Sequence, residues 1–166
     1  MSLSIYLAVP LMALLGILQT AVLPRFPIAG LVPQIPLLVA LAWGLLHGVN
    51  EGVLWAFVAG FFLDLFSISP MGITSLSFMT AVLIVLSIQR ALPRNRFFLP
   101  VLLTILASLI ALFVDLLLLR LLGHPTDLRV AATLPPVALL HGALILPVYW
   151  FMYVLNRRNR PRRVEL

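Results

Sequence analysis

The sequence predicts an all-α integral membrane protein, a compact bundle of six transmembrane helices. Of its 166 residues, 63% are hydrophobic and only 10% are charged, and the mean hydropathy is +1.16. A soluble domain of this length is far less apolar. About 20 apolar residues cross a bilayer as a helix, and the chain holds six such blocks between short polar breaks. We expect a transmembrane domain over residues 1–156 and an arginine-rich cytoplasmic tail over residues 157–166.

Prolines and polar residues mark the ends of the expected helices. The six predicted spans cover residues 3–23, 31–46, 51–66, 70–90, 97–122 and 134–155. The first has no basic leader and no small-residue cleavage site, so we expect a retained helix and not a signal peptide. Pro33 and Pro36 fall in the first turns of the second span, where a missing N–H is harmless.

The later spans carry similar start signals. Asn50 is the expected N-cap of the third span, and Ser69 followed by Pro70 has the cap-and-proline pattern that opens the fourth. Thr133 is the expected cap of the sixth span. Pro147 should kink or locally loosen that last helix.

Arginine placement predicts the orientation. All basic residues are arginines, and with a cytoplasmic N-terminus eight of them fall on the cytoplasmic side and three outside. The eight are Arg90, Arg94, Arg96, Arg157, Arg158, Arg160, Arg162 and Arg163, and the three are Arg25, Arg120 and Arg129. Cytoplasmic loops carry an excess of basic residues, so we expect both termini in the cytoplasm. The first six of the eight form the predicted cytoplasmic positive rim, which suits anionic lipids.

Five polar side chains fall at a similar depth in the outer half of the predicted bundle. They are Gln19, Gln34, Asp64, Asp115 and His141, here called the outer polar cluster. A charged side chain at mid-membrane costs about 2.5–3.5 kcal/mol, so such residues usually face protein, a cavity or the interface. Two explanations stay open for the two acids. Either they anchor helix ends, solvated or paired with Arg120, or they form a buried cluster that receives a partner helix or lines a small outward-facing site.

Small residues recur along the second and third spans. Gly44, Gly48, Gly52, Ala56 and Gly60 follow one another every four residues, and we call them the small-residue face. Such spacing lets helix backbones approach closely in lipid. Packing within the chain is favoured over a dedicated partner face. On the fifth span, Thr104, Ser108, Ala111 and Asp115 form a second stripe, which should also face protein.

Catalytic and metal motifs do not stand out. The serines lack a Gly-x-Ser-x-Gly setting, no glycine-rich phosphate loop is present, and there are no cysteines. His141 has no second histidine or cysteine at ligand spacing, which favours a hydrogen-bonded core histidine over a metal ligand. We therefore expect neither an enzyme nor a bound cofactor or metal.

Two stretches resemble a known family. PQIPLLVALAWGLLHG (residues 33–48) and EGVLWAFVAGFFLDLFSISPMGITSL (residues 51–76) look like the bacterial rod shape-determining protein MreD. The positions that match its pattern are Pro36, Gly52, Gly60, Asp64 and Gly72. The resemblance implies a non-enzymatic scaffold of the cell-elongation machinery in the cytoplasmic (inner) membrane, where peptidoglycan is synthesised. It also implies binding to MreC and, through MreC, to MreB, RodA and an elongation-specific penicillin-binding protein.

The MreD family in turn resembles the S-components of vitamin transporters. This likeness supplies an alternative function, a small-molecule-binding subunit of a membrane transporter. S-components commonly carry Ala-x-x-x-Ala on the first helix, whereas Ala8 and Ala13 are five residues apart here. The pattern occurs instead as Ala107 and Ala111 in the fifth span. We therefore favour the scaffold.

Overall fold

The computed structural model describes residues 3–67, 70–91, 98–124 and 134–158, and these are helical throughout apart from short connections. The α-helices are α1 (Leu3–Ile17), α2 (Ile35–His47), α3 (Val49–Phe66), α4 (Ile73–Ala91), α5 (Leu99–Leu121) and α7 (Leu134–Arg158). A π-helical turn η1 (Leu18–Val22) and a 3-10 turn η2 (Leu23–Arg25) continue α1. No strand is present in the described ranges, so the prediction of an all-α protein is confirmed.

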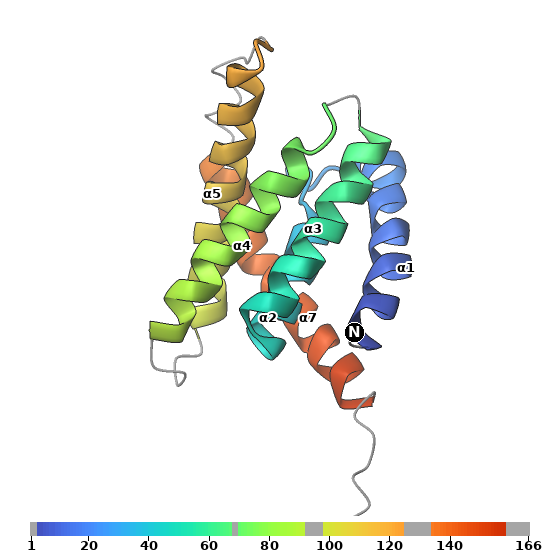
Figure 1. The fold of residues 1–166 in the computed structure, drawn as a ribbon, viewed down its shortest axis with the longest axis vertical. Coiled ribbons are helices and arrows are strands. Elements are labelled where there is room, and N and C mark those ends of the chain that lie inside the picture. The colour runs from blue at the N-terminus through green and yellow to red at the C-terminus, as the bar shows by residue number, and fades with distance from the viewer. Residues whose placement is uncertain (1–2, 68–69, 92–97, 125–133, 159–166) are drawn as a thin grey trace, which may run out of the picture.

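Five of these helical segments are long and apolar enough to cross a membrane, and α2 is a sixth, shorter apolar helix. Consecutive helices run in opposite directions (Figure 1). The N-terminus and the last turn of α7 therefore lie at one end of the bundle, which we call the terminal end. The opposite end, where α3 finishes and α4 begins, is the distal end. The chain is thus a multi-pass helical membrane protein, as predicted.

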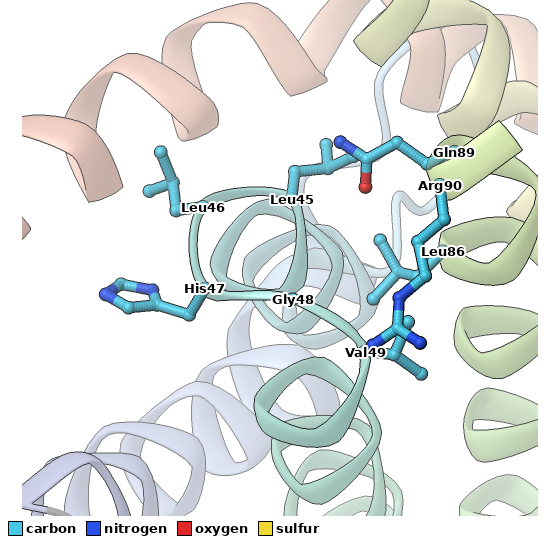
Figure 2. Close-up of a pocket in the computed structure, with 8 residues that line it drawn as sticks. All are labelled: Leu45, Leu46, His47, Gly48, Val49, Leu86, Gln89 and Arg90. Atoms are coloured by element: carbon cyan, nitrogen blue, oxygen red, sulfur yellow. The ribbon is translucent and has the colours of Figure 1, made fainter. Parts of the chain in front are cut away.

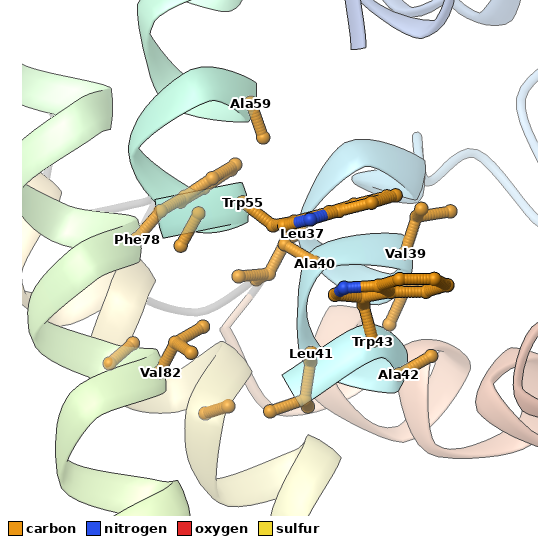
Figure 3. Close-up of a cluster of buried hydrophobic side chains, with 14 of the residues drawn as sticks. Leu37, Val39, Ala40, Leu41, Ala42, Trp43, Trp55, Ala59, Phe78 and Val82 are labelled. Atoms are coloured by element: carbon orange, nitrogen blue, oxygen red, sulfur yellow. The ribbon is translucent and has the colours of Figure 1, made fainter. Parts of the chain in front are cut away.

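Helix α2 lies at the centre of the bundle. Its residues from Pro36 to Gly44 are all buried, and it contacts α1, α3, α4, α5 and α7. The indole rings of Trp43 and Trp55 stack with their centroids 4.5 Å apart, which joins α2 to α3. Figure 3 shows this pair beside Phe78 and Val82 from α4. The core is therefore built around α2.

The helix boundaries differ from the predicted spans at three places. Helix α3 begins at Val49 with Gly48 in the cap position, two residues before the expected cap Asn50. Helix α4 begins at Ile73 and not at Pro70. Helix α2 begins at Ile35, so Pro33 precedes the helix and only Pro36 lies in its first turn. The starts of α2 and α4 are bonded by side chains of other helices, which local cap patterns do not contain, whereas the start of α3 follows the turn at Gly48.

Candidate functional site

Asp64 holds the start of α4. It lies in the last turn of α3 and is only 4% exposed. Its Oδ2 accepts hydrogen bonds from the backbone N–H groups of Gly72 (3.0 Å) and Ser75 (3.1 Å) and from the Ser75 hydroxyl (2.9 Å). Its Oδ1 accepts one from the Thr74 N–H (3.1 Å). The carboxylate thus occupies the N-terminus of α4, where free N–H groups and the helix dipole favour a negative charge.

Gly60 makes this cap possible. It lies one turn before Asp64 on α3, and a Cβ atom at Gly60 would come within 2.4 Å of Ser75 Cα and 2.6 Å of Ser75 N. Only a glycine lets the first turn of α4 approach α3 so closely. Gly72 has φ +98°, a left-handed conformation that directs its N–H toward the carboxylate. In the Gly-x-x-x-Asp pattern, Gly60 therefore lets α4 pack closely against α3, and Asp64 caps α4 one turn later.

Asp115 lies beside this cap and not within it. It is partly buried on α5, near Asp64 and the Ser77 side chain of α4. Among the described residues, no ion pair joins Asp64 or Asp115 to Arg120, which is exposed. The two carboxylates therefore face α4 from different helices and have different roles.

His141 forms a second polar network, at the start of α2. Its ring is fully buried, its Nε2 accepts the backbone N–H of Gln34 (2.9 Å), and its Nδ1 lies 2.7 Å from Ser108 Oγ. Because Nε2 accepts a hydrogen bond, the neutral ring carries its proton on Nδ1 and donates it to Ser108. One imidazole thus links α7, α5 and α2.

Gln19 completes the same network from the π-helical turn η1. Its Nε2 donates to the carbonyl of Pro33 (2.9 Å), and its Oε1 accepts the backbone N–H of Ile35 (3.1 Å). The side chain of Gln34 lies beside them, and its buried Oε1 has no hydrogen-bond partner among the described residues. Gln19 therefore holds the two residues on either side of Gln34, and His141 holds the backbone N–H of Gln34 itself.

The outer polar cluster therefore consists of two separate networks. One holds the start of α4 through Asp64, with Asp115 beside it, and the other holds the start of α2 through Gln19 and His141. The first network lies at the distal end, where α3 finishes and α4 begins. Sequence reasoning did not find Ser75 and Ser77. The available signal was their position, because both serines lie in the first turns of the helix that follows the Pro-Met-Gly break.

The small-residue face lies inside the bundle. A Cβ at Gly44 would come within 2.9 Å of Gly52 Cα, and one at Gly52 within 2.7 Å of Gly44 Cα, so α2 and α3 cross there backbone to backbone. Ala56 is fully buried. Gly48 is different: it has φ +101°, and a Cβ there would meet nothing within 4 Å. It forms the turn between α2 and α3.

The cytoplasmic positive rim is described only in part. Arg90 and Arg157 are exposed in the last turns of α4 and α7, and Arg158 ends α7, all at the terminal end. Arg94, Arg96 and Arg160 lie outside the described residues. The exposed Arg25 and Arg120 lie toward the distal end. The described part of the chain contains no group of three His, Asp or Glu side chains placed to hold a metal ion.

The chain is a multi-pass helical membrane protein. Its helices are long and apolar, their outer faces expose apolar side chains, and the buried polar side chains bond the starts of other helices. The sequence model of the family described as rod shape-determining protein MreD matches residues 1–159 of the 166. The chain belongs to the MreD family, which confirms the resemblance noted in its second to fourth helices. No curated protein and no solved structure matches the chain. Family membership gives it a role in rod-shape determination.

Proposed function

We propose that this chain is a non-enzymatic scaffold of the cell-elongation machinery in the bacterial cytoplasmic membrane, and that it binds MreC directly. The observation that carries the proposal is the family match over residues 1–159. The proposal places both termini in the cytoplasm. MreB, RodA and an elongation-specific penicillin-binding protein join the same complex, with MreC as the link.

The shape of the molecule supports a role through helix contacts. Nearly all described residues belong to membrane-length helices or their short connections, and large apolar side chains are exposed on the outer helices. On α5 and α7 these include Leu102, Phe113, Leu117, Leu121, Leu139, Trp150 and Phe151. Polar contacts between membrane helices contribute only about 0.6 kcal/mol each on average, so a stable partner needs an extended packed face.

The two polar networks supply the rigidity that such a face requires. Asp64 fixes α4 against α3, and His141 fixes α7 against α5 and α2. Since α5 packs between α4 and α7, both networks determine how the outer surface of α5 is presented. In this proposal, Asp64 and Asp115 act on MreC through the arrangement of helices.

Co-purification tests the proposal. Asp64→Leu and Asp115→Leu variants that still insert and fold, as judged by size-exclusion behaviour and helical content, should recover less MreC than the parent chain. Undiminished recovery with both variants would contradict the role of the acids. Cysteine pairs between α5 and a co-expressed MreC span should cross-link, and the chain has no native cysteine to interfere. A small molecule that copurifies stoichiometrically would favour the transporter class instead.

A further inference from the structure

A pocket of about 570 Å³ opens at the terminal end of the bundle, away from both polar networks. It lies where α2 ends, α3 begins and α4 ends (Figure 2). Its lining residues are Leu45, Leu46, His47, Gly48, Val49, Leu86, Gln89 and Arg90. Four of these are aliphatic, and His47, Gln89 and Arg90 add polar groups, so the lining has an aliphatic wall and a polar part, here called the rim.

Arg90 is the cation of this rim. Its side chain is exposed in the last turn of α4, and Figure 2 shows its guanidinium beside Val49, the first residue of α3. No carboxylate pairs with it among the described residues. Glu51, in the first turn of α3, does not line the pocket and has an interaction of its own. The guanidinium is therefore available to an anion.

The start of α3 adds donors next to this cation. The N–H of Gly52 bonds to the carbonyl of Gly48, so the preceding N–H groups of the first turn have no acceptor within the helix. The dipole of this 18-residue helix also favours an anion there. Arginine beside free backbone N–H groups is an arrangement that suits phosphate oxygens.

His47 serves as a wall of the pocket. Its ring stacks on Trp43 at 4.0 Å, and its nitrogens lie 3.3 Å from the Trp43 carbonyl and 3.2 Å from Asn156 Oδ1. The contact with Asn156 joins the end of α2 to α7. Both partners are acceptor oxygens, and a neutral imidazole has one N–H, so the ring donates to one of them. Arg90 and Gln89 are the other polar side chains in the lining.

We infer that this pocket binds the headgroup of an anionic phospholipid, with the phosphate at Arg90 and the upper acyl chain along the aliphatic wall. The apolar wall favours a lipid over a free phosphate ion. Arginines at a membrane surface attract anionic lipids, and a formed pocket adds selectivity for one position.

Lipid retention in native mass spectrometry tests the inference. The full chain is reconstituted in nanodiscs with equal parts of phosphatidylglycerol and phosphatidylcholine, released, and scored for bound lipid. The parent chain should retain phosphatidylglycerol in preference. Arg90→Gln should lower that retention by roughly tenfold, the effect of losing one charge-assisted contact to the phosphate. Arg157→Gln is the matched control, because Arg157 is exposed at the same end but does not line the pocket.

Two further arms separate the alternatives. Leu45→Trp narrows the pocket without changing its charge and should also lower the retention of phosphatidylglycerol. Unaltered retention by this variant would contradict binding along the aliphatic wall. Inorganic phosphate at millimolar concentration should not displace the lipid. Equal loss with Arg90→Gln and Arg157→Gln, or equal retention of both lipids by the parent chain, would overturn the inference. These measurements do not involve MreC, so their outcome is independent of the proposed function.

Discussion

At the scale of single residues, the buried carboxylate of Asp64 has a local explanation. Four donors from the first turn of α4 surround it, which replaces the water that a charge would otherwise need. Asp115 has no such shell of backbone donors among the described residues. The two acids were predicted to lie at a similar depth, but only Asp64 accepts hydrogen bonds from backbone N–H groups of α4 among the described residues.

Removing the Asp64 carboxylate should destabilise the bundle. Asp64→Leu leaves the N–H groups of Thr74 and Ser75 buried without an acceptor and should lower the free energy of unfolding by about 2–4 kcal/mol. Asp64→Asn keeps one acceptor oxygen and should cost less, about 1–2 kcal/mol. Unfolding in bicelles measures both. Asp115→Asn is the comparison, and an effect as large as that of Asp64→Leu would refute the distinction between the two acids.

The contact between His141 and Ser108 should appear as a coupling energy. A double-mutant cycle of His141→Phe and Ser108→Ala should give about 0.6–1.7 kcal/mol, the range for polar contacts between membrane helices. Ser87→Ala is the control partner, because the Ser87 hydroxyl bonds to Leu83 within its own helix. Coupling of His141 to Ser87 as strong as to Ser108 would contradict the assignment.

At the scale of helices, glycines set which pairs pack backbone to backbone. Gly44 and Gly52 place α2 against α3, and Gly60 places the start of α4 against α3. Gly48 has the same spacing but forms a turn. Three glycines of the four-residue period are thus needed for space and one for backbone conformation, and the period alone does not distinguish the two cases.

Gly60→Ala should separate α4 from its cap. The new methyl group would overlap the Ser75 backbone, and overpacking of this kind costs about 1–3 kcal/mol of stability. Gly16→Ala is the matched control in another helix, because its Cβ would lie 3.3 Å from side-chain atoms of Phe62 and Phe66, which can move. Thermal unfolding in detergent compares the two. The interpretation is wrong if Gly16→Ala is the more damaging change.

Most helices could be predicted from the sequence, but some of their starts and turns could not. The number of helical segments and their approximate ranges follow from apolar length. The start of α4 does not, because its capping side chain comes from α3 and lies nine residues before Ile73. The π-helical turn that carries Gln19 was not predicted either. It places Gln19 where its side chain forms hydrogen bonds to residues 33 and 35. Both features depend on contacts made only after folding.

At the scale of the whole molecule, the first turn of α1 and the last turn of α7 lie at the same end, which agrees with an even number of crossings. Which end faces the cytoplasm rests on the arginine count, and several of those arginines lie outside the described residues. Family membership, the helical class and a bundle architecture were all accessible from the sequence. The division of the polar cluster into two networks was not, because depth in the membrane says nothing about lateral position.

Labelling of single cysteines can determine the orientation. Phe26→Cys lies at the distal end, where the parent side chain is 71% exposed, and Asn50→Cys lies at the exposed start of α3 at the terminal end. With both termini in the cytoplasm, a membrane-impermeant maleimide should label the first in intact spheroplasts and the second only after permeabilisation. The opposite pattern would invert the orientation, and the cysteine-free parent provides the background.

Helix α2 also determines how the protein can enter a membrane. Its 13 residues extend about 20 Å at 1.5 Å per residue, short of a hydrocarbon core of about 30 Å. A helix enclosed by five others need not match the bilayer once the protein has folded, but during synthesis it meets lipid alone. Because only Gly48 separates it from α3, we expect the two to insert as one hairpin. In a translocon insertion assay, α2 by itself should integrate poorly and the α2–α3 pair efficiently. Biogenesis thus takes place in units larger than the single helix.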